Sequence, residues 1–141
     1  MKISTKGRYA LRVMIDLAEH DNGDYIKLMD VAERQGISEK YLEGILASMT
    51  RSGLLTAVRG KGGGYRLALS PENITAGRVL RDVEGSLAPV ACLENRPNSC
   101  PRAENCRTLS LWEGLERVIN EYLEGITIAD LANGGADYYC I

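Results

Sequence analysis

The most constraining stretch of this chain is a basic, glycine-rich loop between two short apolar segments. Residues 59–64 read Arg-Gly-Lys-Gly-Gly-Gly, between Leu-Leu-Thr-Ala-Val at 54–58 and Tyr-Arg-Leu-Ala-Leu at 65–69. Segments of this kind predict two strands joined in a hairpin. Glycine permits positive φ and a close approach of the backbone to another surface. Arg59, Lys61 and Arg66 make this hairpin positively charged.

The residues before the hairpin predict a helix-turn-helix. A short helix over residues 29–35 is followed by a turn at Gly36, and Ser38 is a favourable N-cap for a second helix. That second helix carries an apolar stripe at the spacing i, i+3, i+4, i+7, made of Leu42, Ile45, Leu46 and Met49. A basic hairpin directly after two helices joined by a glycine-containing turn is typical of the wing of a DNA-binding domain.

Two other interpretations of the glycine-rich loop stay open. It is either a plain solvent-exposed hairpin or a phosphate-binding loop for a nucleotide. A phosphate-binding loop needs a helix directly after its glycines, and Tyr-Arg-Leu at 65–67 favours a strand. We therefore interpret residues 1–85 as a winged helix-turn-helix domain.

Three further elements complete this domain in the prediction. They are a first helix capped by Ser4 or Thr5 and ending at 21–23, a short strand at 25–27, and a helix capped by Thr75 and closed by Gly85. The second helix of the motif should enter the major groove, where Glu43 can accept a hydrogen bond from a cytosine amino group. The predicted DNA contacts are Ser38, Glu39, Lys40, Tyr41, Glu43, Arg51, Arg59, Gly60, Lys61, Gly62, Gly63 and Tyr65.

The distribution of charge supports a DNA-facing first half. The 141 residues carry a net charge of −2, which alone does not favour nucleic acid. Residues 1–71, however, hold 11 Lys and Arg against 8 Asp and Glu, whereas residues 72–141 hold 6 against 11. The net charges are therefore +3 and −5. A basic half and an acidic half fit a part that faces DNA and a part that lies away from it.

Three of the four cysteines lie together in residues 92–106, spaced Cys-x7-Cys-x5-Cys. Pro97 and Pro101 interrupt any regular element there, so we expect a loop that can fold around a ligand. The chain has no apolar run of the roughly 18 residues that a membrane span needs, and its first residues lack the apolar core of a signal peptide. We therefore expect a cytoplasmic protein with reduced thiols, in which clustered cysteines favour metal or redox chemistry.

The cysteine pattern allows three kinds of site. Cys92, Cys100 and Cys106 can supply three thiolates to an iron–sulfur cluster, contribute to a zinc site, or act as metal-free thiols that oxidise. The chain has one histidine, His20, so a cysteine nucleophile would lack a base, and we do not expect an enzyme. An electron-transfer protein would have little use for the wing.

A long helix is predicted to be capped by Thr108 and to run to about Glu124, with Gly125 at its C′ position, which is commonly left-handed. Its wide apolar stripe has no other long helix in the chain to cover it, so we expect the same helix of a second subunit to do so. The alternative is that the stripe packs back on the first domain. The stripe and predicted dimer interface comprise Leu111, Trp112, Leu115, Val118, Ile119 and Tyr122.

The predicted architecture is therefore mainly α-helical, with a small two-stranded wing. Residues 1–85 form the winged helix-turn-helix domain, residues 86–107 the cysteine-containing loop, and residues 108–125 the dimerisation helix. Residues 126–141 comprise a short helix capped by Thr127 and a tail.

Four stretches resemble the iron–sulfur cluster regulator (IscR) family of bacterial winged-helix transcription factors, whose relatives include the cysteine-metabolism regulator (CymR) and the nitric-oxide-sensing regulator (NsrR). They are residues 1–10, 35–43 and 58–65, and the cysteine trio before Leu111 and Trp112. The resemblance implies a homodimeric repressor of iron–sulfur biogenesis genes that binds a pseudo-palindromic DNA operator and a [2Fe–2S] cluster. It also implies that Arg59 inserts into a narrow A·T minor groove and that Glu43 helps to separate two operator classes.

The chain departs from this family at the fourth cluster ligand. The usual histidine, three residues after the last cysteine, is Leu109 here, and the position of the aspartate ligand in the nitric-oxide sensors is Arg8. The fourth ligand stays open between a carboxylate, water, His20 and Cys140.

The alternative is a regulator of cysteine or sulfur metabolism that acts without a cluster, through thiol oxidation or through cysteine synthase. The ending Tyr-Tyr-Cys-Ile at 138–141 resembles the tail that docks into cysteine synthase in cysteine-metabolism regulators of this family. A frayed terminus with no partner is the other interpretation of this tail.

Overall fold

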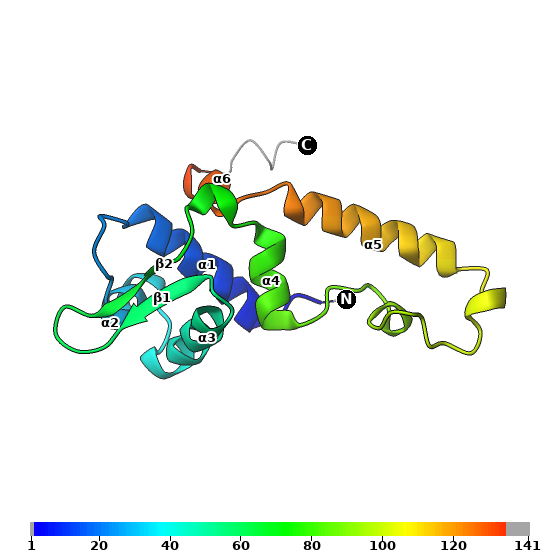
Figure 1. Cartoon of the computed structure of the whole chain (residues 1–141), viewed down its shortest axis with the longest axis horizontal. Coiled ribbons are helices and arrows are strands. Elements are labelled where there is room, and N and C mark those ends of the chain that lie inside the picture. Colours follow the sequence, from blue (N-terminus) through cyan, green and yellow to red (C-terminus); the bar gives the residue numbers. More distant parts are fainter. Residues whose placement is uncertain (1, 135–141) are drawn as a thin grey trace.

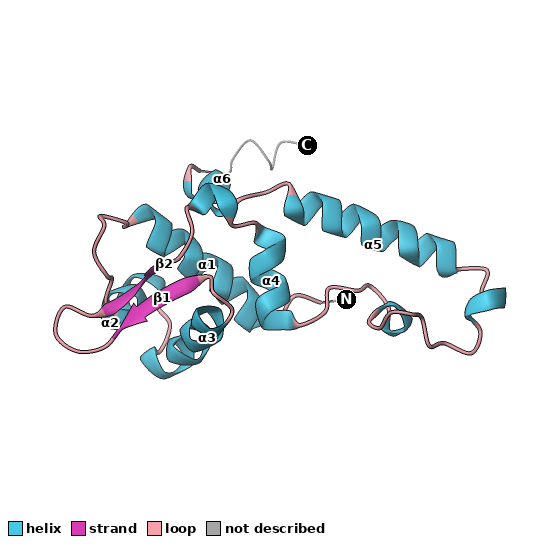
Figure 2. Cartoon of the chain, in the orientation of Figure 1, coloured by secondary structure: helices cyan, strands magenta, loops and turns pink. Residues whose placement is uncertain are grey.

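The structure is a computed structural model that describes residues 2–134. Its main elements are α1 (Thr5–Glu19), α2 (Leu28–Gln35), α3 (Glu39–Arg51), β1 (Leu55–Val58), β2 (Gly64–Leu67), α4 (Ala76–Glu84), α5 (Leu109–Glu124) and α6 (Ile128–Ala132). Single 3-10 turns lie at Pro71–Asn73, Ala91–Leu93 and Ala103–Asn105. The predicted class, mainly α-helical with a two-stranded wing, is confirmed, and Figure 2 shows the hairpin beside the helices.

The hydrophobic core lies in the N-terminal domain, where α1 packs against α4 and α6 and also contacts α2 and α3. The apolar stripe predicted for α3 is buried as expected, from Leu42 to Met49. Because the chain has no phenylalanine, aliphatic side chains and methionines fill the interior. The largest fully buried side chains are Met14, Leu17, Leu42, Ile45, Leu46, Met49, Leu54, Leu55, Ile74, Ile128, Val13 and Val31.

Hydroxyl side chains cap four helices of this core, α1, α3, α4 and α6. Ser4, Ser38 and Thr75 each accept a hydrogen bond from a backbone N–H in the first turn of α1, α3 and α4. Thr127 forms a full capping box with Asp130 at the start of α6. These caps satisfy backbone donors that a helix N-terminus leaves unpaired, and all four were predicted from the sequence.

The ends of α5 differ from the prediction. Thr108 is the residue before α5, but its side chain makes no capping hydrogen bond and its backbone is helical, with ψ of −4°. Its hydroxyl lies instead 3.4 Å from the Sγ of Cys106. Gly125 has φ of −82°, so it is not the left-handed C-terminal glycine that was predicted.

The wing is an antiparallel hairpin in which Val58 pairs with Gly64 and Leu55 pairs with Leu67. The expected strand at 25–27 is reduced to one bridge, in which Ile26 and Tyr65 exchange two backbone hydrogen bonds of 2.8 Å. A Cβ atom at Gly64 would stand 2.2 Å from the carbonyl oxygen of Ile26. Glycine is therefore required where the wing meets the segment before α2.

Arg66 does not charge the tip of the wing as the sequence suggested. Its Nη1 donates to the carbonyl oxygen of Gly23 at 2.9 Å, and its guanidinium lies 4.6 Å from the ring centroid of Tyr25. Arg66 therefore holds the wing against the α1–α2 loop, and its guanidinium contacts Gly23 and Tyr25 instead of standing at the wing tip.

A buried carboxylate fixes α2 against α1. Asp16 is 1% exposed and accepts hydrogen bonds from Arg34 at 2.7 and 3.0 Å and from Gln35 at 2.8 Å. Burial alone raises the pKa of Asp16, but the hydrogen bonds from Arg34 and Gln35 outweigh it and hold the pKa below its usual value. Helix α2 in turn packs against α3, so this network supports the two helices of the motif together.

The C-terminal arm extends away from this core. Figure 1 shows the cysteine-containing loop leading outward from α4, and α5 running back from the far end of that loop toward α6 at the core. Glu124 ties the near end of α5 to α4, since it accepts hydrogen bonds from Arg81 and from Thr75, the latter at 2.9 Å. The hydrogen bond from Arg81 lowers the pKa of Glu124.

The apolar stripe of α5 faces outward. Leu111 and Val118 are each 60% exposed and Tyr122 is 53% exposed. Packing of the stripe back on the first domain is therefore not observed in residues 2–134. Over the same residues, no helix is long and apolar enough to cross a membrane.

Candidate nucleic-acid interface and cysteine loop

The exposed face of α3 presents the residues predicted to read DNA. Ser38, Glu39, Lys40, Glu43 and Arg51 are all exposed, on the side of the helix opposite its buried stripe. Helix α3 is the second helix of the motif. Its side chains are therefore free to meet the edges of base pairs.

The wing tip lies next to this face. Arg59, Gly60, Lys61 and Gly62 are exposed, whereas Gly63 is buried. Gly60 and Gly62 have φ of 91° and 80°, and the N–H of Gly63 donates to the carbonyl oxygen of Gly60 at 3.0 Å. The glycines thus form a tight, defined turn that presents Arg59 and Lys61 to solvent.

A groove joins α3 to the wing. It is lined by Ala47, Thr50, Arg51, Ala57, Val58, Arg59, Gly64 and Tyr65. The structure therefore brings together Arg51, Arg59 and Tyr65, which the sequence predicted as one set.

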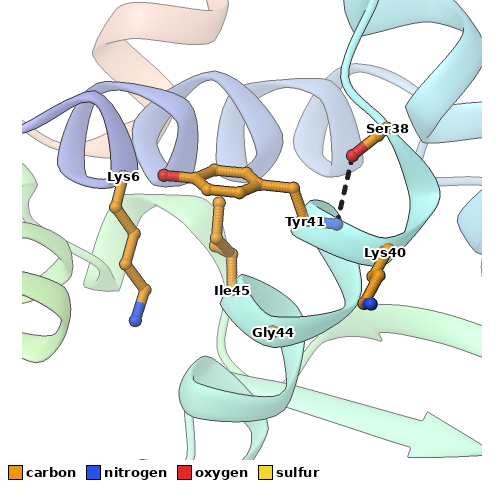
Figure 3. Close-up of a pocket in the computed structure, with 6 residues that line it drawn as sticks. All are labelled: Lys6, Ser38, Lys40, Tyr41, Gly44 and Ile45. Carbon is orange, nitrogen blue, oxygen red and sulfur yellow. Dashed lines mark hydrogen bonds between the residues drawn. The ribbon is translucent and has the colours of Figure 1, made fainter.

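A second cleft, at the other end of α3, was not predicted. It lies between α3 and the first turn of α1 and is lined by Lys6, Ser38, Lys40, Tyr41, Gly44 and Ile45, as Figure 3 shows. Tyr41 stands with its ring edge-on to Tyr9, at 5.8 Å between centroids and 86° between planes. The sequence analysis missed Lys6, Tyr9 and Gly44. The one sequence signal that pointed to this cleft was the basic first turn of α1. Hydrophobic periodicity does not predict that this turn lies against α3.

The cysteine-containing loop is built from short turns. Cys92 lies in the 3-10 turn Ala91–Leu93, and Cys106 follows the turn Ala103–Asn105. Cys92, Cys100 and Cys106 are free thiols of intermediate exposure. The hydrogen bond with the hydroxyl of Thr108 lowers the pKa of Cys106, which favours the thiolate form that binds metals.

Polar contacts connect this loop to the rest of the molecule. Arg96 in the loop pairs with Glu116 of α5, a carboxylate of which only 9% is exposed. On the other side, Glu84 at the end of α4 accepts hydrogen bonds from the N–H and hydroxyl of Ser4, at 3.0 and 2.6 Å. Residues 86–91 run from Glu84 to Cys92 and line a hollow with Lys2 and Ile3. The loop is thus linked to α5 by Arg96, and its first residues lie beside the segment that precedes α1.

The chemical type of the ligands in the loop fits an iron–sulfur cluster, because thiolates are the usual ligands of such clusters. Three thiols lie in one segment that has no long regular element. Within residues 2–134, no three His, Cys, Asp or Glu side chains gather into a metal-holding group. The predicted sharing of one cluster by Cys92, Cys100 and Cys106 therefore stays a prediction, and the loop must close to achieve it.

Two of the candidates for the fourth cluster ligand, His20 and Cys140, can be compared with the described part of the chain. His20 caps the C-terminal end of α1, where its Nδ1 lies 2.9 Å from the carbonyl oxygen of Asp16. Figure 1 places that end of α1 away from the cysteine-containing loop, so His20 does not belong to the same site. Cys140 and the rest of the 138–141 tail lie outside the described residues.

Comparison with known proteins gives a consistent result. A sequence profile of the Rrf2 family, described as an iron-dependent transcriptional regulator, matches residues 3–134. The HTH-type transcriptional regulator IscR of Aliivibrio salmonicida is 40% identical over 131 residues, which cover 93% of this chain and 77% of that protein.

Two solved structures share the fold at similar identity. The structure of CymR, described as the global cysteine regulator of B. subtilis, superimposes with a TM-score of 0.76 at 37% identity, covering 94% of this chain and 97% of that one. The structure of T. potens IscR gives a TM-score of 0.75 at 37% identity, covering 100% and 93%. The helix-turn-helix, the wing and these comparisons agree: the chain belongs to the Rrf2 family and is a non-enzymatic, DNA-binding transcriptional regulator of the IscR type.

Proposed function

We propose that this regulator is a homodimeric repressor that senses iron–sulfur cluster status through a [2Fe–2S] cluster and controls genes of iron–sulfur biogenesis. Cys92, Cys100 and Cys106 supply three of the cluster ligands. The observation that carries the proposal is their position in one loop that is tied to α5 through Arg96 and that follows directly after α4 of the DNA-binding domain. The IscR names of its relatives support the same function.

The proposed DNA contacts are those of α3 and the wing. Helix α3 enters the major groove, with Glu39, Lys40 and Glu43 toward base edges and backbone. Arg59 inserts into the adjacent minor groove, whose negative potential is strongest in narrow A·T stretches. The exposed stripe of α5 forms the dimer interface with the same stripe of a second subunit.

The coupling follows from the geometry of a two-fold dimer. Two half-sites are read together when the two recognition helices lie about one helical turn of DNA apart. The loop lies between the DNA-binding domain and the dimer helix, so its order affects how the two domains are spaced. The bound cluster supplies a redox-sensitive link between the thiols. Arg96 connects the loop to α5 through Glu116, and the chain itself connects the loop to the end of α4 in the DNA-binding domain.

The test is anaerobic purification and reconstitution of the full chain. We expect visible absorbance and about two irons and two sulfides per chain, both lost in Cys92→Ala. The matched comparison is Cys140→Ala: a retained cluster in that variant shows that the fourth ligand lies elsewhere. A colourless, iron-free wild-type protein after reconstitution would refute the cluster.

A second candidate function is a CymR-like regulator of cysteine metabolism without a cluster. Leu109 at the position of the usual histidine ligand and the close match to the CymR fold favour it. In that case the protein stays colourless, and its affinity for DNA changes on oxidation of the thiols. Isothermal titration with cysteine synthase, comparing the full chain with one lacking Ile141, tests the predicted tail contact.

A further inference from the structure

Gly44 lies in the middle of the recognition helix without a reason in the fold. Helix α3 spans Glu39–Arg51, Gly44 does not have a positive φ, and a Cβ atom built on it would meet nothing within 4 Å. Glycine in a helix interior is less stable than alanine, because it loses more backbone freedom on folding. An exposed glycine also allows another molecule to approach the backbone closely.

Gly44 opens onto the cleft between α1 and α3. Figure 3 shows Lys6 and Lys40 on opposite sides of Tyr41 and Ile45, with Gly44 on the helix below them. The cleft has a volume of about 510 Å³ and a mainly apolar surface. Lys6 comes from the first turn of α1, so the two positive charges belong to two different helices.

This combination matches one strand of a nucleic-acid backbone. A deoxyribose is largely apolar and fits a floor made of an aromatic ring and an isoleucine, while its phosphates attract lysines on either side. The nearest carboxylates on α3, Glu39 and Glu43, do not line the cleft, so they do not repel a phosphate from within it.

We propose that this cleft binds the sugar–phosphate backbone of the DNA beside the groove that α3 reads. Gly44 lets the DNA backbone approach the surface of α3. Lys6, which lies on α1, contacts a DNA phosphate. Tyr41 forms one wall of the cleft and is held in place by its ring contact with Tyr9. The inference rests on the proposed entry of α3 into the major groove. It adds α1 to the DNA interface and predicts contacts that do not depend on base sequence.

The first test is Gly44→Ala, measured by thermal unfolding and by fluorescence anisotropy with a labelled duplex of mixed sequence at low salt. We expect Tm to rise by about 2–4 °C and the affinity for the duplex to fall by roughly tenfold. The control is Gly114→Ala, since a Cβ atom there would come no closer than 3.5 Å to a neighbouring side chain. Unchanged affinity or a lower Tm in Gly44→Ala would overturn the inference.

The second test is Lys6→Gln with the same duplex over a series of KCl concentrations. Loss of one phosphate contact should make the plot of log affinity against log salt less steep, reducing the magnitude of its negative slope by about one. Arg117→Gln on α5 removes the same charge from an exposed residue outside the interface and should leave the slope unchanged. Equal slopes for wild type and Lys6→Gln would exclude the phosphate contact.

Arg59→Ala separates failure of this inference from failure of the proposed DNA orientation. The probe is an operator selected with the protein from a library of random duplexes. If Arg59→Ala weakens operator binding while Gly44→Ala and Lys6→Gln bind the mixed duplex like wild type, the wing assignment stands and the cleft assignment falls. If all three bind like wild type, the orientation of α3 and the wing is itself wrong.

Discussion

The winged-helix domain and the C-terminal arm bury opposite kinds of side chain. In the first domain, Leu42, Leu46 and Met49 are buried, and charged residues such as Lys40 and Arg51 face solvent. In α5, Leu111 and Val118 face solvent, whereas the carboxylate Glu116 is buried. An amphipathic helix with its apolar stripe outward is incomplete as a monomer. The first domain, completed by α6, therefore has its own closed core, whereas α5 leaves an apolar stripe uncovered in the described residues.

The two regions also differ in how their polar groups are used. Asp16 in the first domain has three side-chain hydrogen bonds that lock α2 to α1. In the arm, the contacts of Glu124 and Glu116 connect segments that otherwise pack little: α4 to α5, and α5 to the cysteine-containing loop. Such isolated ties between elements suit a region whose arrangement changes when a ligand binds.

The largest expected effect is on the core of the first domain. Leu46→Ala should lower the free energy of unfolding by about 2–5 kcal/mol, since it removes a fully buried side chain and leaves a cavity. The matched variant Leu111→Ala, on the exposed stripe, should change the free energy of unfolding of the monomer by less than about 0.5 kcal/mol. Denaturant titration of both changes in the monomeric Val118→Glu background compares the two regions without a contribution from the dimer interface. Similar losses would show that the arm contributes to the same core.

Val118→Glu should break the proposed dimer. A carboxylate at this position would be buried without a partner in the interface, which costs several kcal/mol. Light scattering should show monomers, whereas Arg117→Glu, next to it on the helix but off the stripe, should stay dimeric. A clean dimer of Val118→Glu would place the interface elsewhere.

Arg59→Ala should weaken binding to the selected operator by about 1–3 kcal/mol. The wing backbone is fixed by glycines and by the bridge to Ile26, so the variant should stay folded, which circular dichroism can check. Gel-shift titration measures the affinity. Arg66→Ala is an informative comparison, because Arg66 is bound to Gly23 and Tyr25 and should act through stability of the wing.

The smallest predicted effect is on pH dependence. Because the pKa of Asp16 is lowered in the folded state, the unfolded state binds more protons, and stability falls as pH falls. The contribution is present above the unfolded value of about 3.9 and disappears as pH drops through the folded value. Asp16→Asn should flatten the acid limb of a plot of unfolding free energy against pH. An unchanged acid limb would show that other groups dominate it.

Much of the fold could be predicted from local sequence signals. The caps Ser4, Ser38, Thr75 and Thr127, the buried stripe of α3 and the glycine-rich hairpin all depend on short-range patterns. Arg66 could not be placed, because its partners lie 43 residues away at Gly23 and in the neighbouring Tyr25.

The site was predicted less fully than the fold. The exposed face of α3 and the wing can be predicted from periodicity. Lys6 and Gly44 come together only in the folded structure, where α1 lies against α3. The cysteines could be grouped by spacing, yet spacing does not state the shape of an irregular loop. The N-cap expected at Thr108 was wrong because its hydroxyl contacts Cys106 instead.

The central claim is that the cysteine-containing loop controls the DNA-binding domain through a cluster. The most direct measurement is the affinity for one selected operator, by anaerobic anisotropy, of the cluster-loaded protein and of the same sample after removal of the cluster. For the wild type, we expect removal of the cluster to change the affinity or the choice between operators. For Cys92→Ala, we expect the same treatment to leave the affinity for DNA unchanged. Identical affinity and operator choice with and without the cluster would contradict the account.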